Sequence, residues 1–234
     1  MTELLRIGHK GADLIEPGNT LASFDAALAH GVDMIEFDVL PEDSTRPLEA
    51  RLVLSHDPEH VPGALELNDG LAHLAAPAFA QLRFNLDMKT PGYEERVLDA
   101  LRTHGLLERT IVSTMWMRSL VRLRELEPAL RLGWSVPRLQ RDYAASRAWI
   151  VPAYGGLLYL RRRVVRAARR HLAAGRCDAV MANWRLVTRA LVRAVRESGG
   201  ELYVWTVDDA RQIRRLERLG VTGVITNDPR LFRV

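Results

Sequence analysis

The stretch Met34-Ile35-Glu36-Phe37-Asp38-Val39 is a short apolar run that carries two carboxylates two positions apart. Side chains alternate across a strand, so Glu36 and Asp38 leave one face while the apolar residues leave the other. Two neighbouring acids are costly to bury unless a cation neutralises them, and hard divalent cations bind such oxygen ligands. The stretch therefore predicts a metal site on a strand, and the alternative is a strand edge whose acids face water.

Strands and helices alternate on both sides of this stretch. Residues 4–9 are typical of a short buried strand, and residues 21–28 predict a helix that Asn19 or Thr20 caps. Residues 51–57 follow too closely for a crossover helix, so we expect an extra strand in the loop. After a short helix near 71–82, we expect strands at 84–89, 110–114, 131–136, 178–183, 201–207 and 222–226, and helices at 93–104, 118–127, 158–174, 186–198 and 209–219.

Eight strands that alternate with helices predict a (β/α)8 TIM barrel with a small extra strand and loop after the second strand. A doubly wound open sheet is the alternative. It is disfavoured because the first turn has no glycine-rich phosphate fingerprint and because polar residues end many different strands. A chain of 234 residues of which 47% are hydrophobic can bury one large core, so residues 1–234 are expected to form a single domain.

Composition sets the expected compartment and partners. Cys177 is the only cysteine, which excludes an intrachain disulfide and is typical of a reducing compartment. No apolar signal segment begins the sequence, and no run of eighteen apolar residues occurs in it. We therefore expect a soluble, cytoplasmic protein with no stable membrane insertion, whose oligomeric state the sequence leaves open.

The charges divide unevenly along the chain. Residues 1–117 hold 9 basic and 19 acidic side chains, whereas residues 118–234 hold 24 and 10. The basic excess peaks at 161–176, where arginines alternate with apolar residues at helical spacing. We interpret this segment as the solvated face of an outer helix, with a membrane or oligomer contact as the alternative. Aromatic residues do not interleave with these arginines, so no nucleic-acid partner is expected.

Polar residues collect at the predicted rim of the barrel. Six side chains with acid, base or charge chemistry belong to this rim: His9, Glu36, Asp38, His56, Asp87 and Lys89. This set suits phosphoryl transfer, with a divalent cation on the three carboxylates and the lysine stabilising charge in the transition state. The two histidines would act as proton donor and acceptor near their natural pKa. Among 33 basic residues only Lys10 and Lys89 are lysines, and both fall in this region.

Several motifs in this order resemble the glycerophosphodiester phosphodiesterase family. They are His9-Lys10-Gly11, Pro17-Gly18-Asn19-Thr20-Leu21, Ile35-Glu36-Phe37-Asp38-Val39, Ser55-His56-Asp57, Asp87-Met88-Lys89, Val204-Trp205-Thr206-Val207 and Gly223-Val224-Ile225-Thr226. The similarity covers nearly the whole chain. It implies a (β/α)8 barrel and metal-dependent hydrolysis of glycerophosphodiesters to glycerol 3-phosphate and an alcohol, a role in lipid and glycerol metabolism.

The resemblance also implies roles for single residues. The histidines that match His9 and His56 form the acid and base pair of the family. The acids that match Glu36, Asp38 and Asp87 bind calcium or magnesium. The lysine that matches Lys89 contacts phosphate, Lys10 stands where a phosphate-binding arginine is usual, and Trp205 matches a tryptophan on the pocket wall or serves as a core aromatic. The glycerol hydroxyl of the substrate is thought to attack first and give a cyclic phosphate that water then opens.

The sequence departs from the usual family pattern at several positions. Lys10 replaces an arginine, Gly18 replaces a glutamate, and Asp87 replaces a glutamate that is one methylene longer. Asp208 and Asn227 stand where asparagine and aspartate are usual. These changes bear on the substrate more than on the reaction class. A phospholipase D-like activity on lysolipids and a barrel that only binds phosphodiesters or metal are therefore the competing hypotheses.

Overall fold

The computed structural model describes residues 3–136 and 150–233, with side chains from 156 onward in the second range. Strands and helices alternate through these residues as β1 (Leu5–Gly8), α1 (Leu21–Ala29), β2 (Met34–Pro41), β3 (Leu52–Val53), α2 (Leu67–Leu74), β4 (Arg83–Met88), α3 (Glu94–Thr103), β5 (Thr110–Thr114), α4 (Met117–Leu126), β6 (Arg131–Val136), α5 (Ile150–Ala173), β7 (Ala179–Asn183), α6 (Arg189–Glu197), β8 (Glu201–Trp205), α7 (Ala210–Leu219) and β9 (Gly223–Thr226).

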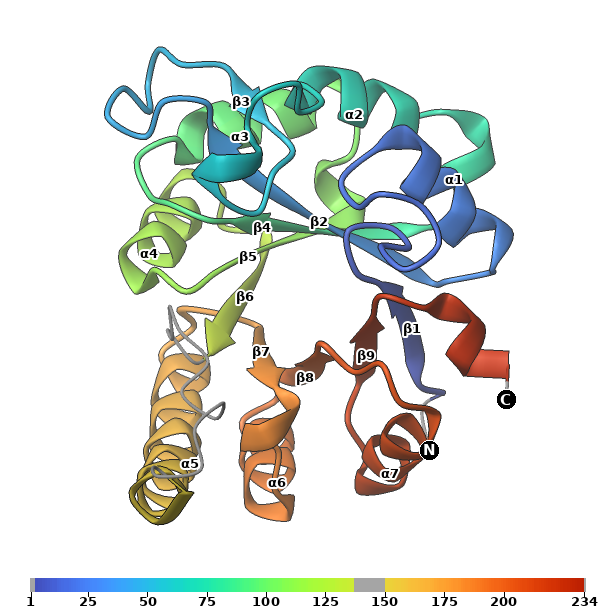
Figure 1. Ribbon diagram of the computed structural model, residues 1–234. Coiled ribbons are helices and arrows are strands. Elements are labelled where there is room, and N and C mark those ends of the chain that lie inside the picture. Colours follow the sequence, from blue (N-terminus) through green and yellow to red (C-terminus); the bar gives the residue numbers. More distant parts are fainter. Residues whose placement is uncertain (1–2, 137–149, 234) are drawn as a thin grey trace.

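Eight parallel strands form a closed barrel. Each strand except β3 pairs in parallel with its neighbours in the order β1-β2-β4-β5-β6-β7-β8-β9, and β9 pairs again with β1. Helices α1 to α4 lie outside the half of the barrel that contains β2 to β5, and α5 to α7 lie outside the other half (Figure 1). The (β/α)8 TIM barrel with an extra strand is confirmed, and the doubly wound open sheet is excluded because the sheet closes on itself.

The inside of the barrel is filled in layers. A lower layer consists of fully buried side chains from β1, β2, β5, β7, β8 and β9: Ile7, Met34, Ile111, Ala179, Met181, Tyr203 and Ile225. Because side chains alternate along a strand, residues two positions further on point to the same side, nearer the carboxyl ends. His9, Glu36, Ser113 and Trp205 follow Ile7, Met34, Ile111 and Tyr203 in this way. The apolar layer therefore forms the floor beneath the polar residues at the mouth.

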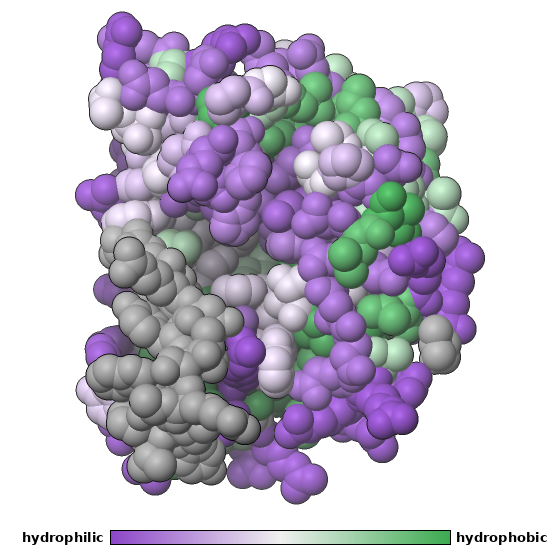
Figure 2. All heavy atoms as spheres, in the orientation of Figure 1, coloured by the Kyte–Doolittle hydropathy of each residue, from purple (hydrophilic) through white to green (hydrophobic). Residues whose placement is uncertain are grey.

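Helix α5 presents arginines to solvent, as the sequence predicts. Val164, Ala168 and Leu172 are buried against the barrel, whereas Arg163 and Arg166 are exposed. Among the residues coloured in Figure 2, hydrophilic ones cover most of the face. Among the residues that the structure describes, no helix combines the length and the apolar character that a bilayer crossing requires. The cytoplasmic location and the single-domain organisation stay predictions.

Some predicted elements have other bounds. The strand predicted at 51–57 is limited to Leu52–Val53, because it pairs with β2 only where that strand ends and the Leu54 amide then bonds the Leu65 carbonyl. His56 thus lies in a loop. The helix predicted at 71–82 is Leu67–Leu74, since Pro77 lacks the N–H needed to continue it. Helix α5 begins at Ile150 rather than 158, and α6, capped by Thr188, begins at Arg189, three residues later than expected.

Candidate active site

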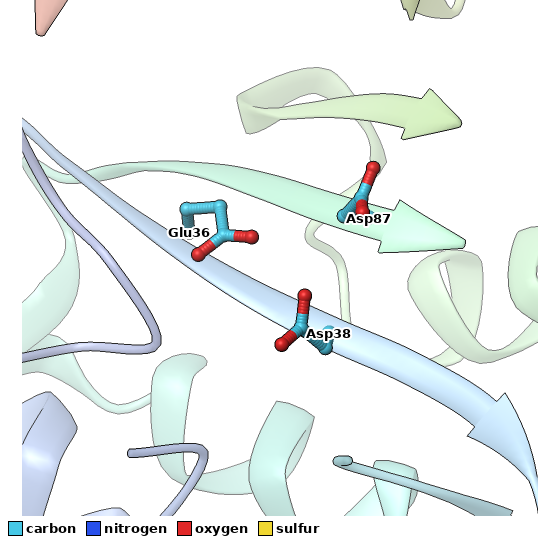
Figure 3. A group of neighbouring side chains, drawn as sticks. All are labelled: Glu36, Asp38 and Asp87. Atoms are coloured by element: carbon cyan, nitrogen blue, oxygen red, sulfur yellow. The ribbon is translucent and has the colours of Figure 1, made fainter. Parts of the chain in front are cut away.

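Three carboxylates converge on one point at the mouth of the barrel. Glu36 and Asp38 leave the same face of β2, and the register of β2 with β4 places Asp38 opposite Asp87. Figure 3 shows the three side chains grouped together on the adjacent strands β2 and β4. One oxygen from each lies within 4.8 Å of the others. The structure thus brings together the three acids that the sequence predicts as metal ligands.

The Lys89 ammonium lies between two of these acids. Its Nζ is 2.5 Å from Asp38 Oδ1 and 2.6 Å from Asp87 Oδ2. Asp38 is fully buried, and burial opposes its ionisation. The Lys89 charge, together with the charges of His56 and His9 and the hydrogen bond from Lys89, outweighs this effect and holds the pKa of Asp38 well below its usual range. Although burial lowers the pKa of Lys89, the charges of Asp38 and Asp87 raise it above its ordinary value.

Glu36 lies deeper than the lysine. It is 5% exposed, and its Oε2 accepts a hydrogen bond of 2.9 Å from the Lys10 backbone amide. Burial, followed by the negative charge of Asp38, raises the pKa of Glu36 well above its usual range. Three carboxylates and one ammonium leave two negative charges when all are ionised. Oxygen ligands with this excess charge fit a divalent cation such as Mg²⁺ or Ca²⁺, which would favour the ionised form of Glu36.

The two predicted catalytic histidines flank the carboxylates. His9 follows β1, and its Nε2 is 3.9 Å from Glu36 Oε2 while its Nδ1 is 2.6 Å from Asn227 Oδ1. His56 lies on the loop after β3 with 53% of its side chain exposed. Burial is the main cause that lowers the pKa of both rings, and for His56 the Lys89 charge adds to it. The charges of His56 and His9 lower the pKa of Asp38, although less than the charge of Lys89 does. Both histidines therefore lie close enough to Asp38 to interact with it electrostatically.

Lys10 and Gly18 form a local unit with an acid that the sequence analysis did not single out. Lys10 Nζ donates to Asp13 Oδ2 at 3.2 Å, and the Gly18 amide donates to Asp13 Oδ1 at 2.9 Å. A Cβ on Gly18 would lie 2.4 Å from that same oxygen. The Asp13 carboxylate therefore occupies the space beside Gly18, and the Lys10 ammonium is bound to it. The phosphate contact expected of Lys10 stays a prediction.

Trp205 ends β8 and lies at the mouth. It is partly exposed and packs against the apolar layer that contains Tyr203 and Ile225. The position suits both of its predicted roles, because the ring covers the apolar floor and borders the space above it. Trp205 as a substrate contact stays a prediction.

The structure adds hydrogen-bond partners of the site that the sequence alone did not assign to it. Asn19 Nδ2 donates to Asp38 Oδ2 at 3.2 Å, and the Asp38 amide donates to Asn19 Oδ1 at 3.0 Å. Ser113 Oγ and Ser135 Oγ donate to Asp87 Oδ1 at 2.7 and 3.3 Å. Asn227 contacts His9, as described above. The sequence could have indicated the two serines, because side chains alternate along β5 and β6 and this alternation places both serines inside the barrel beside Asp87.

The acids, the lysine and the two histidines lie at the carboxyl ends of the strands, where (β/α)8-barrel enzymes have their active sites. Together with the fold, they are typical of a hydrolase. A model of the glycerophosphoryl diester phosphodiesterase family matches residues 9–61 and 84–231. The chain therefore belongs to the glycerophosphoryl diester phosphodiesterase family. The predicted family and enzyme class, a phosphoric diester hydrolase, are both confirmed.

Individual relatives match along almost their full lengths. A glycerophosphodiester phosphodiesterase of Caldanaerobacter subterraneus is 24% identical, and the match covers 96% of this chain and 94% of that protein. The structure of such an enzyme from Agrobacterium tumefaciens is similar with a TM-score of 0.71 and 18% identity, over 99% of this chain and all of that one. A phosphodiesterase of Oleispira antarctica, solved with the product sn-glycerol-3-phosphate, has a TM-score of 0.70 and 18% identity over 98% and 95% of the chains.

Proposed function

We propose that this chain hydrolyses glycerophosphodiesters to glycerol 3-phosphate and an alcohol, with a divalent cation on Glu36, Asp38 and Asp87. The observation that carries the proposal is the convergence of these carboxylates beside Lys89, with two histidines whose charges both lower the pKa of Asp38. A bound cation would neutralise phosphate oxygens and stabilise charge that develops on them. The product complex of the Oleispira antarctica relative supports glycerol 3-phosphate as the product.

The protein side chains have separate tasks in this proposal. One of His9 and His56 takes the proton of the attacking hydroxyl and must be neutral to do so, whereas the other must be protonated to give a proton to the leaving oxygen. The lowered pKa of both rings favours the neutral form that the base requires. Lys89 is held by Asp38 and Asp87, so its positive charge lies ready beside the phosphate oxygens. Trp205 and Lys10 contribute to substrate binding at the rim. The reaction takes place at the mouth of the barrel, where the partly exposed His56 is accessible to substrate from solvent.

The first test is turnover of two water-soluble substrates. Purified protein is incubated with glycerophosphocholine or glycerophosphoethanolamine in the presence of magnesium, calcium, manganese or a chelator, and released glycerol 3-phosphate is measured. Release that depends on a cation supports both the reaction and the metal site. Release that a chelator does not reduce contradicts the metal site. If no cation gives release, lysolipids are tested next, and failure there favours a barrel that only binds its ligand.

Histidine variants test the proton-transfer roles. His9→Ala and His56→Ala are each expected to lower kcat by roughly 10²- to 10⁴-fold, the usual contribution of a general acid or base. His73→Ala is the matched control, because His73 bonds Asp25 at 2.8 Å on the outer surface and is expected to keep full activity. Full diesterase activity in both active-site variants would show that these histidines do not transfer the protons.

A further inference from the structure

Asp208 and Asn227 form a hydrogen-bond chain that ends on His9. Asn227 Nδ2 is 2.7 Å from Asp208 Oδ2, and the Asn227 backbone amide donates to Asp208 Oδ1 at 2.8 Å. Thr226 Oγ1 donates to the same oxygen at 3.0 Å. At the other end, Asn227 Oδ1 lies 2.6 Å from His9 Nδ1. The acid is thus fixed by two further donors before it meets the asparagine side chain.

The chemistry of these groups determines the direction of every hydrogen bond. An ionised carboxylate only accepts, so the asparagine must turn its NH₂ group to Asp208. Its carbonyl oxygen then faces His9, and an amide oxygen also only accepts. The opposite orientation would bring two acceptors within 2.7 Å of each other. His9 Nδ1 must therefore carry the hydrogen and donate to Asn227.

This direction leaves the other ring nitrogen free of hydrogen. A neutral imidazole has one N–H, so a hydrogen on Nδ1 makes Nε2 the acceptor. Nε2 is the nitrogen on the side of the carboxylate group, 3.9 Å from Glu36 Oε2. The backbone also holds the ring in place, because the His9 amide donates to the Thr226 carbonyl at 2.8 Å. Asn227 achieves this orientation without placing a charge against the ring.

We propose that Asp208 and Asn227 are positioning residues that hold neutral His9 in the Nδ1–H tautomer, so that Nε2 is the nitrogen that exchanges a proton with the substrate. The part that concerns the substrate rests on the proposed function. The tautomer itself does not, since it follows from hydrogen bonds within the chain. Asp208 acts only through Asn227, and Asn227 acts only through the ring of His9.

The tautomer is measured directly by ¹⁵N NMR of histidine-labelled protein, with magnesium and with chelator. The chemical shifts of the two ring nitrogens show which one carries the hydrogen. The wild type is expected to show His9 with hydrogen on Nδ1 in both conditions. Asn227→Ala removes the acceptor and is expected to give a different tautomer or a mixture. Asn183→Ala is the matched control, because Asn183 also ends a strand but accepts from the Arg185 amide at 3.1 Å.

Exchange of the residues at 208 and 227 tests the direction of the hydrogen bonds. In Asn227→Asp two carboxylates meet, and in Asp208→Asn the amide of Asn227 loses its fixed acceptor. The double variant D208N/N227D pairs a donor at 208 with an acceptor at 227 again, and the new carboxylate still accepts from His9 Nδ1. Asp208→Asn is expected to disturb the tautomer, because the Asn227 amide can then turn either end to His9, and the double variant is expected to restore it. A purely structural role for these residues would not predict this recovery.

Activity supplies a second, separate measurement. Asn227→Ala is expected to lower kcat by roughly 10- to 100-fold, as the loss of a residue that orients a functional side chain usually does, with a smaller change in KM. An Nε2–H tautomer in the wild type, or an unchanged tautomer in Asn227→Ala, would overturn the proposal whatever the activity. An absence of turnover in a wild type with hydrogen on Nδ1 would instead count against the proposed function.

Discussion

The positive charge of Lys89 compensates two buried acids, so its removal should destabilise the folded protein measurably. Lys89→Met keeps the length of the side chain and deletes its charge. The Lys89 side chain is 16% exposed, and Asp38 beside it is fully buried. Removal of one partner from a buried ion pair costs roughly 3–5 kcal/mol. Since Asp38 or Asp87 can take up a proton and relieve part of this cost, we expect about 3 kcal/mol.

The assay is thermal unfolding by circular dichroism in chelator and in magnesium. For a chain of this size 1 kcal/mol corresponds to about 2–4 °C, so Tm in chelator should fall by about 6–12 °C. Magnesium should recover more stability in Lys89→Met than in the wild type, because the cation replaces the missing charge. Lys89 depresses the pKa of Asp38, so the stability it contributes is present above the unfolded pKa of about 3.9 and is lost as pH falls.

Arg230→Met is the matched control for this prediction. Arg230 also pairs with an acid, since its Nε is 2.7 Å from Asp228 Oδ1, but 57% of its side chain is exposed. Exposed ion pairs contribute little to stability because water screens them, so the Tm of Arg230→Met should change little. If Lys89→Met and Arg230→Met lowered Tm by the same small amount, the carboxylates would not depend on Lys89 for charge compensation, and the electrostatic argument for the site would be refuted.

Three further predictions concern residues around the site and its supporting strands. Asn19 has φ of +60° and two hydrogen bonds with Asp38, so Asn19→Ala should cost about 2–3 kcal/mol in urea unfolding, while Asn19→Gly removes the backbone strain and isolates the hydrogen bonds. Burial raises the pKa of Asp33, but hydrogen bonds from Arg6 outweigh it and lower this pKa. Asp33→Asn should therefore lower the free energy of unfolding by about 1 kcal/mol above pH 4. The difference should vanish at lower pH, where Asp33 of the wild type is protonated. Magnesium at about 100 times its Kd should raise the free energy of unfolding by about 2.7 kcal/mol, measured in urea, and Asp87→Asn should abolish the gain.

The alternation of side chains along single strands made much of the site predictable. Glu36 with Asp38, and Asp87 with Lys89, are each two positions apart, so their common face follows from the period of a strand. The closed barrel then places neighbouring strands side by side with their carboxyl ends at one rim. These two rules suffice to bring the four side chains together: the structure shows Lys89 in contact with Asp38 and Asp87, and the three carboxylates close to one another.

Partners that come from loops were not predictable in the same way. Either Asn19 or Thr20 could cap the helix that follows them, and the structure shows that Thr20 is the cap. The contacts of Asn19 with Asp38 depend on a positive φ that turns the side chain inward, and the sequence carries no sign of that turn. Asp13 is similar, because its contact with Gly18 exists only once the loop has closed.

The longest-range contact of the site follows from the closure of the barrel. β1 pairs with β2 on one side and with β9 on the other, and the β1–β9 register places Gly8 opposite Thr226. One residue further on, His9 therefore meets Asn227, which is 218 positions away in the chain. The carboxylates and Lys89 need only β2 and β4, whereas the orientation of His9 needs the last strand of the barrel. A perturbation confined to β9 should thus disturb the proton-transfer histidine while the cluster of Glu36, Asp38 and Asp87 keeps its geometry, so that cation binding and turnover become separable properties of the same mouth.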